Sequence, residues 1–133
     1  MRKTFRQFPA ICVCVLLALA ACAGLQPQVT VGPETGEKAI AMKASNFKFV
    51  PNNIKAYQGD IIVLEVENVS DSEHNLTIKD PHGQVLQNAD IPPKKTVKFR
   101  IALPEAGEYD FYCDEPFHTT FGMKGRFEVI ERQ

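Results

Sequence analysis

Residues 111–125 read FYCDEPFHTTFGMKG, and this stretch decides how the chain folds and what it binds. Four residues separate Cys113 from His118, and four more separate His118 from Met123. A thiolate, an imidazole and a thioether form a soft ligand set that favours copper. A weak axial Met over a plane of two His and one Cys is the arrangement of electron-transfer copper sites. The spacing predicts a metal-binding loop between two strands.

A site of this kind needs a second histidine, and the chain has three in all. Besides His118, the candidates are His74 and His82. His82 falls in Asp80-Pro81-His82-Gly83, which is a strong turn signal and predicts an exposed ring. His74 stands at the end of a polar connection and beside the start of a strand. We therefore expect His74 to complete the site, with His82 as the competitor.

The same residue types also have ordinary structural interpretations. A lone methionine such as Met123 more often fills a core than binds a metal. His118 alone could be a surface histidine, and Cys113 alone could be an inert buried thiol. The regular spacing of the three residues favours ligands over these alternatives.

After residue 38 the sequence predicts short strands separated by turns. Alternating apolar positions and β-branched or aromatic residues recur at short intervals, and no stretch shows a sustained helical period. The expected strands are 39–43, 46–50, 54–57, 61–68, 75–79, 96–102, 108–113 and 125–131, with a further edge piece at 85–86. Seven or eight short strands in one domain predict an all-β fold: a two-sheet antiparallel Greek-key sandwich.

The loop resembles the copper loop of the cupredoxins, the family that includes plastocyanin, azurin, rusticyanin and auracyanin. Its four-residue gaps are similar to the longer loops of rusticyanin and auracyanin. An earlier histidine completes the site in this family, and here the matching motif is Glu73-His74-Asn75-Leu76. The resemblance implies one copper ion cycling between Cu(II) and Cu(I), held by His74, Cys113, His118 and Met123.

One position departs from the family pattern. Several relatives carry Ser or Thr directly after the Cys, where it bonds the Asn that follows the first His. This chain has Asp114 there, while Asn75 keeps the partner position. We expect Asn75 and Asp114 to support the ligands, because such contacts orient a ligand and tune its metal.

The N-terminus resembles a bacterial lipoprotein leader. A basic start is followed by eleven apolar residues, 11–21, which are too few to span a bilayer as a helix. The run closes on Leu19-Ala20-Ala21-Cys22, which resembles a lipobox and predicts lipidation of Cys22. The expected division is a signal peptide at 1–21, the lipidated Cys and a flexible tether at 22–37, and one domain at 38–133. An ordinary cleaved signal and a permanent membrane anchor are the alternatives.

Removal of the signal also takes away two of the four cysteines, Cys12 and Cys14. With Cys22 lipidated, Cys113 is left without a disulfide partner in an oxidising compartment, which calls for another role such as metal ligation. The mature chain keeps 12 basic and 16 acidic residues, a formal charge of −4. A basic stripe is absent, so we expect no nucleic-acid partner.

These features predict a single-electron carrier rather than an enzyme, because four ligands leave no open position for a substrate. His118 would be the electron port, Pro116, Phe117 and Phe121 would form an apolar docking patch, and nearby acids would steer a basic partner. We expect a monomer on the bacterial cell envelope, facing the periplasm or the exterior, at the outer membrane if there are two. Its redox partner would be a cytochrome or a copper enzyme. A copper-trafficking or storage protein is the alternative.

Overall fold

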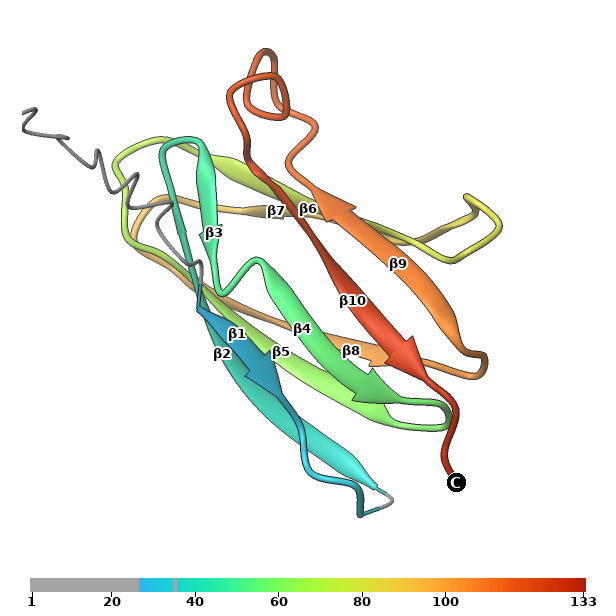
Figure 1. The fold of residues 1–133 in the computed structure, drawn as a ribbon. Helices are drawn as coiled ribbons and strands as arrows, with labels where there is room; N and C mark the ends of the chain where they lie inside the picture. The colour runs from blue at the N-terminus through green and yellow to red at the C-terminus, as the bar shows by residue number, and fades with distance from the viewer. Residues whose placement is uncertain (1–26, 35) are drawn as a thin grey trace, which may run out of the picture.

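The computed structural model describes residues 27–34 and 36–133, and within them it shows ten strands (Figure 1). The strands are β1 (Gln28–Thr30), β2 (Glu37–Ser45), β3 (Lys48–Val50), β4 (Asn53–Tyr57), β5 (Ile61–Asn68), β6 (His74–Lys79), β7 (Val85–Ile91), β8 (Thr96–Ala102), β9 (Gly107–Tyr112) and β10 (Lys124–Ile130). Over this part of the chain, no helix has the length and apolar character needed to cross a membrane. The leader and Cys22 lie outside the described residues.

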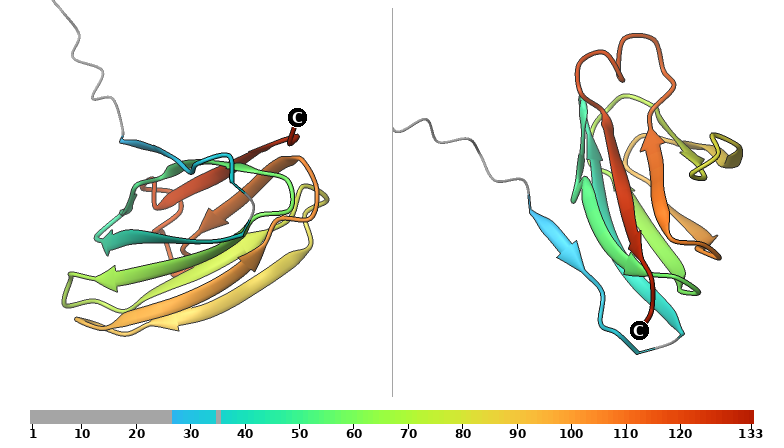
Figure 2. Two further views of the ribbon diagram at one scale, coloured as in Figure 1. Left: turned by 90° about the horizontal axis from the view of Figure 1, so that it is seen from below. Right: turned by 45° about the vertical axis from the view of Figure 1, so that its right-hand side comes forward.

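The strands form two sheets packed face to face (Figure 2). The larger sheet has the order β1-β4-β10-β9-β6-β7, and the smaller has the order β3-β2-β5-β8. The predicted all-β, two-sheet sandwich is confirmed, and its strand order is consistent with a Greek key. The sheets are mixed rather than wholly antiparallel, because β1 and β10 pair parallel to β4 and β2 pairs parallel to β5. Parallel neighbours need crossover connections, which alternation along one strand does not reveal.

Alternating apolar residues fill the space between the sheets. Ile62, Leu64 and Val66 are fully buried along β5, as their shared face predicts. Phe111 stands at the centre of an aromatic cluster, with its ring 5.7 Å from Phe49 and 5.3 Å from Phe127. The core therefore joins both sheets and holds the strands that lead into and out of the 113–123 loop.

Two segments are more ordered than the sequence predicts. β7 extends over seven residues, although only its first two residues suggested a strand. Its remaining positions are mostly polar because this edge strand is half exposed, so composition hides it. β1 lies inside the range 22–37 that we expected to be a flexible tether. The ordered domain thus begins about ten residues earlier than the expected residue 38.

Tertiary contacts hold β1 in place. Its three residues pair in parallel register with Asn53, Ile54 and Lys55 of β4. The Val31 N–H then donates to the Lys55 carbonyl at 3.0 Å, and the Val31 side chain is only 9% exposed. Three paired residues are too few for any periodic signal in the sequence. The pairing exists only because the edge of β4 is present to receive it.

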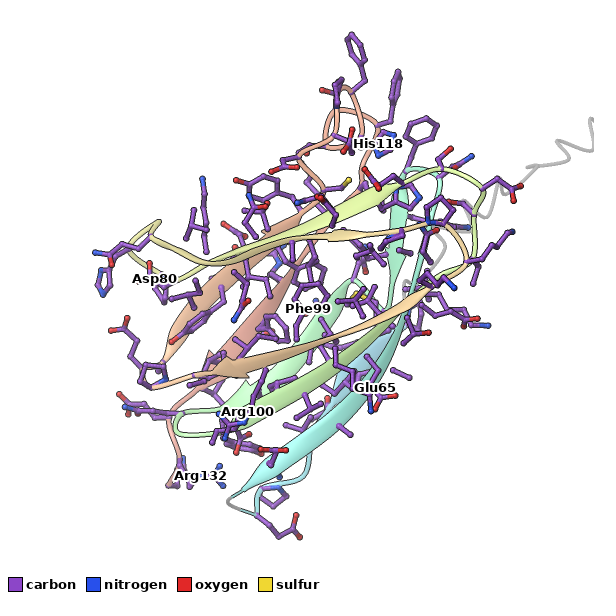
Figure 3. All side chains as sticks on the ribbon, turned by 180° about the vertical axis from the view of Figure 1, so that it is seen from behind. Glu65, Asp80, Phe99, Arg100, His118 and Arg132 are labelled. Atoms are coloured by element: carbon purple, nitrogen blue, oxygen red, sulfur yellow. The ribbon has the colours of Figure 1, made fainter. Side chains whose placement is uncertain are left out.

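The sandwich has two ends, which we call the ligand end and the far end. The ligand end carries the loop of residues 113–123, the β2–β3 turn at 46–47 and the β5–β6 connection at 69–73. The far end carries the turn at 58–60, where the backbone N–H groups of Gln58 and Gly59 donate to the carbonyls of Ile130 and Leu103. Figure 3 shows His118 and Arg132 at these opposite ends.

Candidate metal centre

The loop between β9 and β10 is held closed by its own backbone. The Cys113 N–H donates to the Met123 carbonyl at 3.1 Å, and the Met123 N–H donates to the His118 carbonyl at 2.9 Å. The Thr119 hydroxyl donates to the Cys113 carbonyl at 2.5 Å. These hydrogen bonds connect the backbones of Cys113, His118 and Met123, so the loop holds the three residues close together.

His74 enters the same region from the first position of β6, and its ring is fully buried. Its Nε2 lies 2.9 Å from the Ser70 hydroxyl oxygen. Ser70 Oγ in turn lies 2.8 Å from the Asn68 side-chain carbonyl, which accepts its proton. Ser70 therefore accepts from Nε2–H, which leaves the Nδ1 lone pair of His74 free. In the sequence, Ser70 stands out only as part of the polar connection 70–73.

Three ligand atoms converge at the ligand end. His118 Nδ1 lies 3.3 Å from Cys113 Sγ and 3.3 Å from His74 Nδ1. All three atoms fall within 4.8 Å of one another, and among the described residues they form a group able to hold a metal ion. Two imidazole nitrogens and one thiol sulfur form the soft donor set that would suit a copper ion.

The surroundings favour the neutral imidazole at His74. Burial, and secondarily the charge of His118, lowers the pKa of His74. At Cys113, burial is the main cause of a raised thiol pKa, opposed by the hydrogen bond from the Asn75 backbone. That Asn75 N–H donates to Cys113 Sγ at 3.3 Å. A metal cation would replace the thiol proton, because the thiolate is the ligand form.

Met123 is fully buried beside this group, directly before β10. Its backbone bonds to Cys113 and His118 place its Cα at the base of the loop. A buried, flexible thioether in this position is suited to a weak axial contact.

A polar network connects Asn75 to Asp114. The Asn75 amide donates to Asn88 Oδ1 at 2.9 Å, and the Asn88 amide donates to Asp114 Oδ2 at 3.0 Å. On the other side, Thr77 Oγ1 lies 2.8 Å from Asn75 Oδ1 and 3.2 Å from Asp114 Oδ2. Thr77 and Asn88 thus bridge the two residues that directly contact each other in several relatives. Local sequence gives no signal for either residue, since both lie on strands far from the loop in the chain.

An apolar surface covers the loop side of the ligand end. Phe117 and Phe121 are 72% and 63% exposed, and Pro116 beside them is exposed as well. Phe47, from the β2–β3 turn, packs edge-on against His118, with the ring centres 5.4 Å apart. It also packs at a tilt against Phe121, with the ring centres 5.0 Å apart. We call Phe47, Pro116, Phe117 and Phe121 the apolar rim. Phe47 was missed because nothing in its local sequence connects it with residues 70 positions later.

Two rim residues adopt a backbone conformation that favours glycine. Phe47 has φ 65° and Phe117 has φ 68°. The left-handed region costs a residue with a Cβ about 1–2 kcal/mol. Backbone strain of this kind concentrates at functional sites. Exposed aromatic rings at two such positions favour an interpretation in which the rings contact another molecule at the surface.

His82 lies apart from this group. It sits in the exposed turn between β6 and β7, where its Nε2 is 3.0 Å from a carboxylate oxygen of Glu105. The metal-binding group of the described residues includes His74 and not His82. The geometry thus groups His74, which the sequence favours, with Cys113 and His118 and leaves the competitor His82 outside.

Comparison with solved structures shows the same fold. A reduced auracyanin from Roseiflexus castenholzii is 18% identical, with a TM-score of 0.60, covering 74% of this chain and 98% of that one. Auracyanin B gives the same identity and TM-score, covering 74% of this chain and 92% of that one. No curated protein matches the sequence. At this identity the likeness concerns the fold alone.

The model of one protein family, described as the cupredoxin-like domain, matches residues 10–129, which is most of the chain. The group formed by His74, Cys113 and His118 supplies the soft nitrogen and sulfur donors that copper prefers. The fold, the family model and the donor set all indicate the same cofactor. That cofactor is copper. The chain belongs to the cupredoxin-like family.

Proposed function

We propose that the protein is a single-electron carrier with one copper ion held by His74, Cys113, His118 and Met123. Copper bound there supplies reversible exchange between Cu(II) and Cu(I). The observation that carries the proposal is the convergence of two imidazole nitrogens and one thiol sulfur at a buried point. If Met123 supplied the fourth donor, His74, Cys113, His118 and Met123 together would hold the ion without an open position for a substrate, as expected for an electron carrier that is not an enzyme.

The chain's own residues keep the site rigid. The loop hydrogen bonds and the Ser70 contact to His74 restrain the donor atoms, so little rearrangement accompanies a change of charge. His118 points its Nδ1 toward Cys113 and His74, so the opposite edge of its ring faces the apolar rim. We infer that this edge is the path for electrons.

The apolar rim is the proposed docking surface for the redox partner. It is small and surrounds His118, as a brief encounter between carriers requires. Asp71 and Glu73 are exposed on the neighbouring connection and would steer a basic partner. A cytochrome or a copper enzyme could fill that role. We propose that the carrier acts as a monomer.

Copper storage or trafficking is the rival function, and the methionines argue against it. A storage or trafficking module exposes several Met side chains to a metal. Met42 and Met123 are the two methionines after the leader, and both are buried, at 1% and 0% exposure. A surface for Cu(I) transfer through thioethers is therefore missing from the described residues.

The proposed location is the bacterial cell envelope, with a lipid on Cys22 as the membrane anchor. The basic and apolar leader and the Leu19-Ala20-Ala21-Cys22 motif support this proposal. Two or more acyl chains hold a protein stably, whereas one chain does so only reversibly. Ala23 after the cysteine favours the outer membrane where two membranes exist.

The visible spectrum tests the copper site. Addition of one equivalent of Cu(II) should produce an intense thiolate-to-copper absorption band, and Cys113→Ser should abolish it. Met123→Leu should keep the band but shift its energy and raise the reduction potential, because a weak axial ligand tunes the copper. Met42→Leu is the matched control, since it changes an equally buried methionine on β2. A wild-type protein that binds copper without this band would disprove the electron-carrier site.

A further inference from the structure

The imidazole of His74 is held by a hydroxyl group, which does not by itself decide where the ring proton lies. The partner of His74 Nε2 is Ser70 Oγ, at 2.9 Å. The usual partner of a metal-binding histidine is a carboxylate, a backbone carbonyl or water. A carbonyl or a carboxylate only accepts hydrogen bonds, whereas a hydroxyl can accept or donate. Another residue must therefore fix the direction of the hydrogen bond between Ser70 and His74.

Asn68, the last residue of β5, supplies this direction and is fully buried. Its Oδ1 accepts from the Ser70 backbone N–H at 3.0 Å and from the Ser70 hydroxyl at 2.8 Å. The other acceptor near this hydroxyl, the Ser72 carbonyl oxygen at 3.1 Å, likewise has no proton to give. The single hydroxyl hydrogen of Ser70 is thus used by Asn68 or Ser72, and Ser70 Oγ accepts from His74 Nε2–H.

The side-chain amide of Asn68 is fixed in its orientation. Its Nδ2 donates to the Ser72 carbonyl at 2.8 Å and to the Ile91 carbonyl at 2.9 Å. A half-turn of the amide would place Oδ1 against these two carbonyls and Nδ2 against the Ser70 backbone N–H. Buried polar groups would then lose their partners, which is costly. The hydrogen bonds therefore run in one direction, from His74 through Ser70 to Asn68.

The same amide also holds the backbone that carries His74. Ile91, whose carbonyl accepts from Asn68, is the residue of β7 that pairs with His74 of β6. The Asn68 backbone N–H donates to the Lys95 carbonyl at 2.9 Å, in the connection that follows β7. The ring of His74 and the strand pair that carries it are thus both tied to Asn68. Movement of the ring relative to β6 would break hydrogen bonds at a fully buried group.

We propose that Asn68, acting through Ser70, is the positioning residue for His74. This inference rests on the proposed copper site, of which His74 is a ligand. With the ring proton kept on Nε2, the Nδ1 atom that lies 3.3 Å from His118 Nδ1 stays available to the metal before copper arrives. A histidine that donates to a partner is also a stronger donor to its metal. The more highly charged Cu(II) gains more from this than Cu(I), so the two residues lower the reduction potential.

Nitrogen-15 NMR of the copper-free mature protein tests the direction of the hydrogen bonds. At about pH 8, where imidazole is neutral, wild type should carry the His74 ring proton on Nε2 and exchange it slowly with water. Ser70→Ala removes the acceptor, so this proton should exchange about tenfold faster or move in part to Nδ1. Ser70→Thr keeps a hydroxyl and should restore the wild-type signal. Ser72→Ala is the matched control, because it removes an exposed hydroxyl from the same connection.

Two variants of Asn68 separate its positioning role from its contribution to stability. Asn68→Asp keeps an oxygen that accepts from Ser70 but loses both donors, so it should lower stability and retain the ring proton on Nε2. Asn68→Leu removes the acceptor as well and should shift the proton toward Nδ1. In a Ser70→Ala background, Asn68→Leu should cause no further shift, because the effect passes through Ser70. If Asn68→Leu does not fold, the Ser70 variants and Asn68→Asp still decide the question.

The copper-loaded protein gives a second measurement. Ser70→Ala should lower the affinity for Cu(II) about tenfold, as is typical for residues that support a metal ligand. If the affinity for Cu(I) stays the same, this loss corresponds to a rise of about 59 mV in the reduction potential. Ser70→Thr and Ser72→Ala should remain at the wild-type potential. Chelator competition and voltammetry measure both quantities.

The possible failures can be told apart. If Ser70→Ala exchanged the His74 ring proton as slowly as wild type, Ser70 would not be its acceptor and the proposal would be overturned. A ring proton displaced from Nε2 in Asn68→Asp, which keeps the acceptor, would equally remove Asn68 from this role. Absence of the thiolate-to-copper band in wild type would instead disprove the copper site, and the NMR result on the copper-free protein would still stand.

Discussion

At the scale of single residues, the ligand end carries aromatic residues that are exposed to solvent or have a left-handed backbone. Smaller or polar residues at these positions would favour stability more. Phe117 is the clearest case, because it is the most exposed of the large apolar residues that the structure describes and also has a left-handed backbone. Such a residue contributes little burial to folding. Its ring is available to the redox partner that we propose docks at the apolar rim.

The first prediction separates stability from function at Phe117. Phe117→Gly should leave the free energy of unfolding unchanged or raise it by up to about 1 kcal/mol, since relief of strain is partly offset by the greater freedom of glycine when unfolded. Electron transfer to the partner should slow several-fold, with the spectrum unchanged. Urea unfolding and stopped-flow kinetics measure the two effects.

Val85→Ala is the control for this prediction, because Val85 is 56% exposed on β7 and lies outside the apolar rim. It should leave the transfer rate as it is. A loss of stability in Phe117→Gly together with normal transfer would remove Phe117 from the docking surface.

The second prediction concerns Asn88, which bonds both Asn75 and Asp114. Asn88→Ala should loosen the contact between β6 and the residue that follows Cys113. We expect copper affinity to fall about tenfold, the lower part of the range for residues that support metal ligands, because Asn88 is exposed and water can replace it in part. The reduction potential should shift as well. Competition with a copper chelator and voltammetry measure these effects.

The neighbouring Leu86→Ala changes an exposed residue on the same strand and should have neither effect. Asn88→Asp keeps an acceptor for Asn75 but places a carboxylate beside Asp114, so it should not restore affinity. If Asn88→Ala matched wild type in both measurements, the network would have no role at the metal.

At the scale of elements, β10 joins the loop to the core through a position with no room for a side chain. A Cβ on Gly125 would lie 2.2 Å from the Asn52 carbonyl oxygen and 2.5 Å from the Phe111 ring. The chain between β3 and β4 therefore crosses directly over the start of β10. This close approach holds β4 against β10 at the point where the 113–123 loop joins β10.

The third prediction follows from that contact. Gly125→Ala should lower the free energy of unfolding by about 2 kcal/mol, because neither a backbone carbonyl nor a core ring can move aside without loss of packing. Urea unfolding of the copper-free protein gives this quantity directly. Lys124→Ala, next to it and exposed, should change it little. Equal stability of the two variants would mean that the close approach is relaxed in solution.

At the scale of the whole molecule, copper bound to neighbouring elements of the larger sheet should stabilise the folded domain as a unit. The ligands come from β6 and from the β9–β10 loop, and a ligand that binds only the folded state stabilises all of it. Free Cu(II) at 100 times its dissociation constant contributes about 2.7 kcal/mol. For a domain of this size, that raises the melting temperature by roughly 10 °C or more.

Differential scanning calorimetry with and without copper checks this fourth prediction. Cys113→Ser should lose most of the rise, because the thiolate is the strongest ligand. An equal rise in Cys113→Ser would place the stabilising copper elsewhere on the protein.

Much of the site could be predicted from the sequence because its information is local. Cys113, His118 and Met123 lie in one loop, so their spacing alone indicates soft ligation. Apolar alternation along β5 likewise determines which face is buried, since a strand repeats every two residues. The strong turn signal around His82 favoured His74 over it. These features depend only on residues close together in the chain.

Other features exist only because distant segments meet in the folded domain. Phe47 joins the apolar rim, and Thr77 and Asn88 bridge Asn75 to Asp114, through contacts between separate strands. Parallel pairing of β4 with β10 depends on the crossover between sheets. Local pattern carries no signal for such contacts, because their partners are set by the topology.

The loop at residues 111–125 thus determined the expected metal chemistry by itself, while the tertiary structure decided where the segment before β2 lies. Three residues of β1 have no pattern of their own, and the sequence predicts a tether there. Paired to the open edge of β4, they lie along the larger sheet, with Gln28 level with Arg126 of β10. The physical reason is that a strand's place in a sheet depends on the edge available to it, which no short stretch of sequence contains.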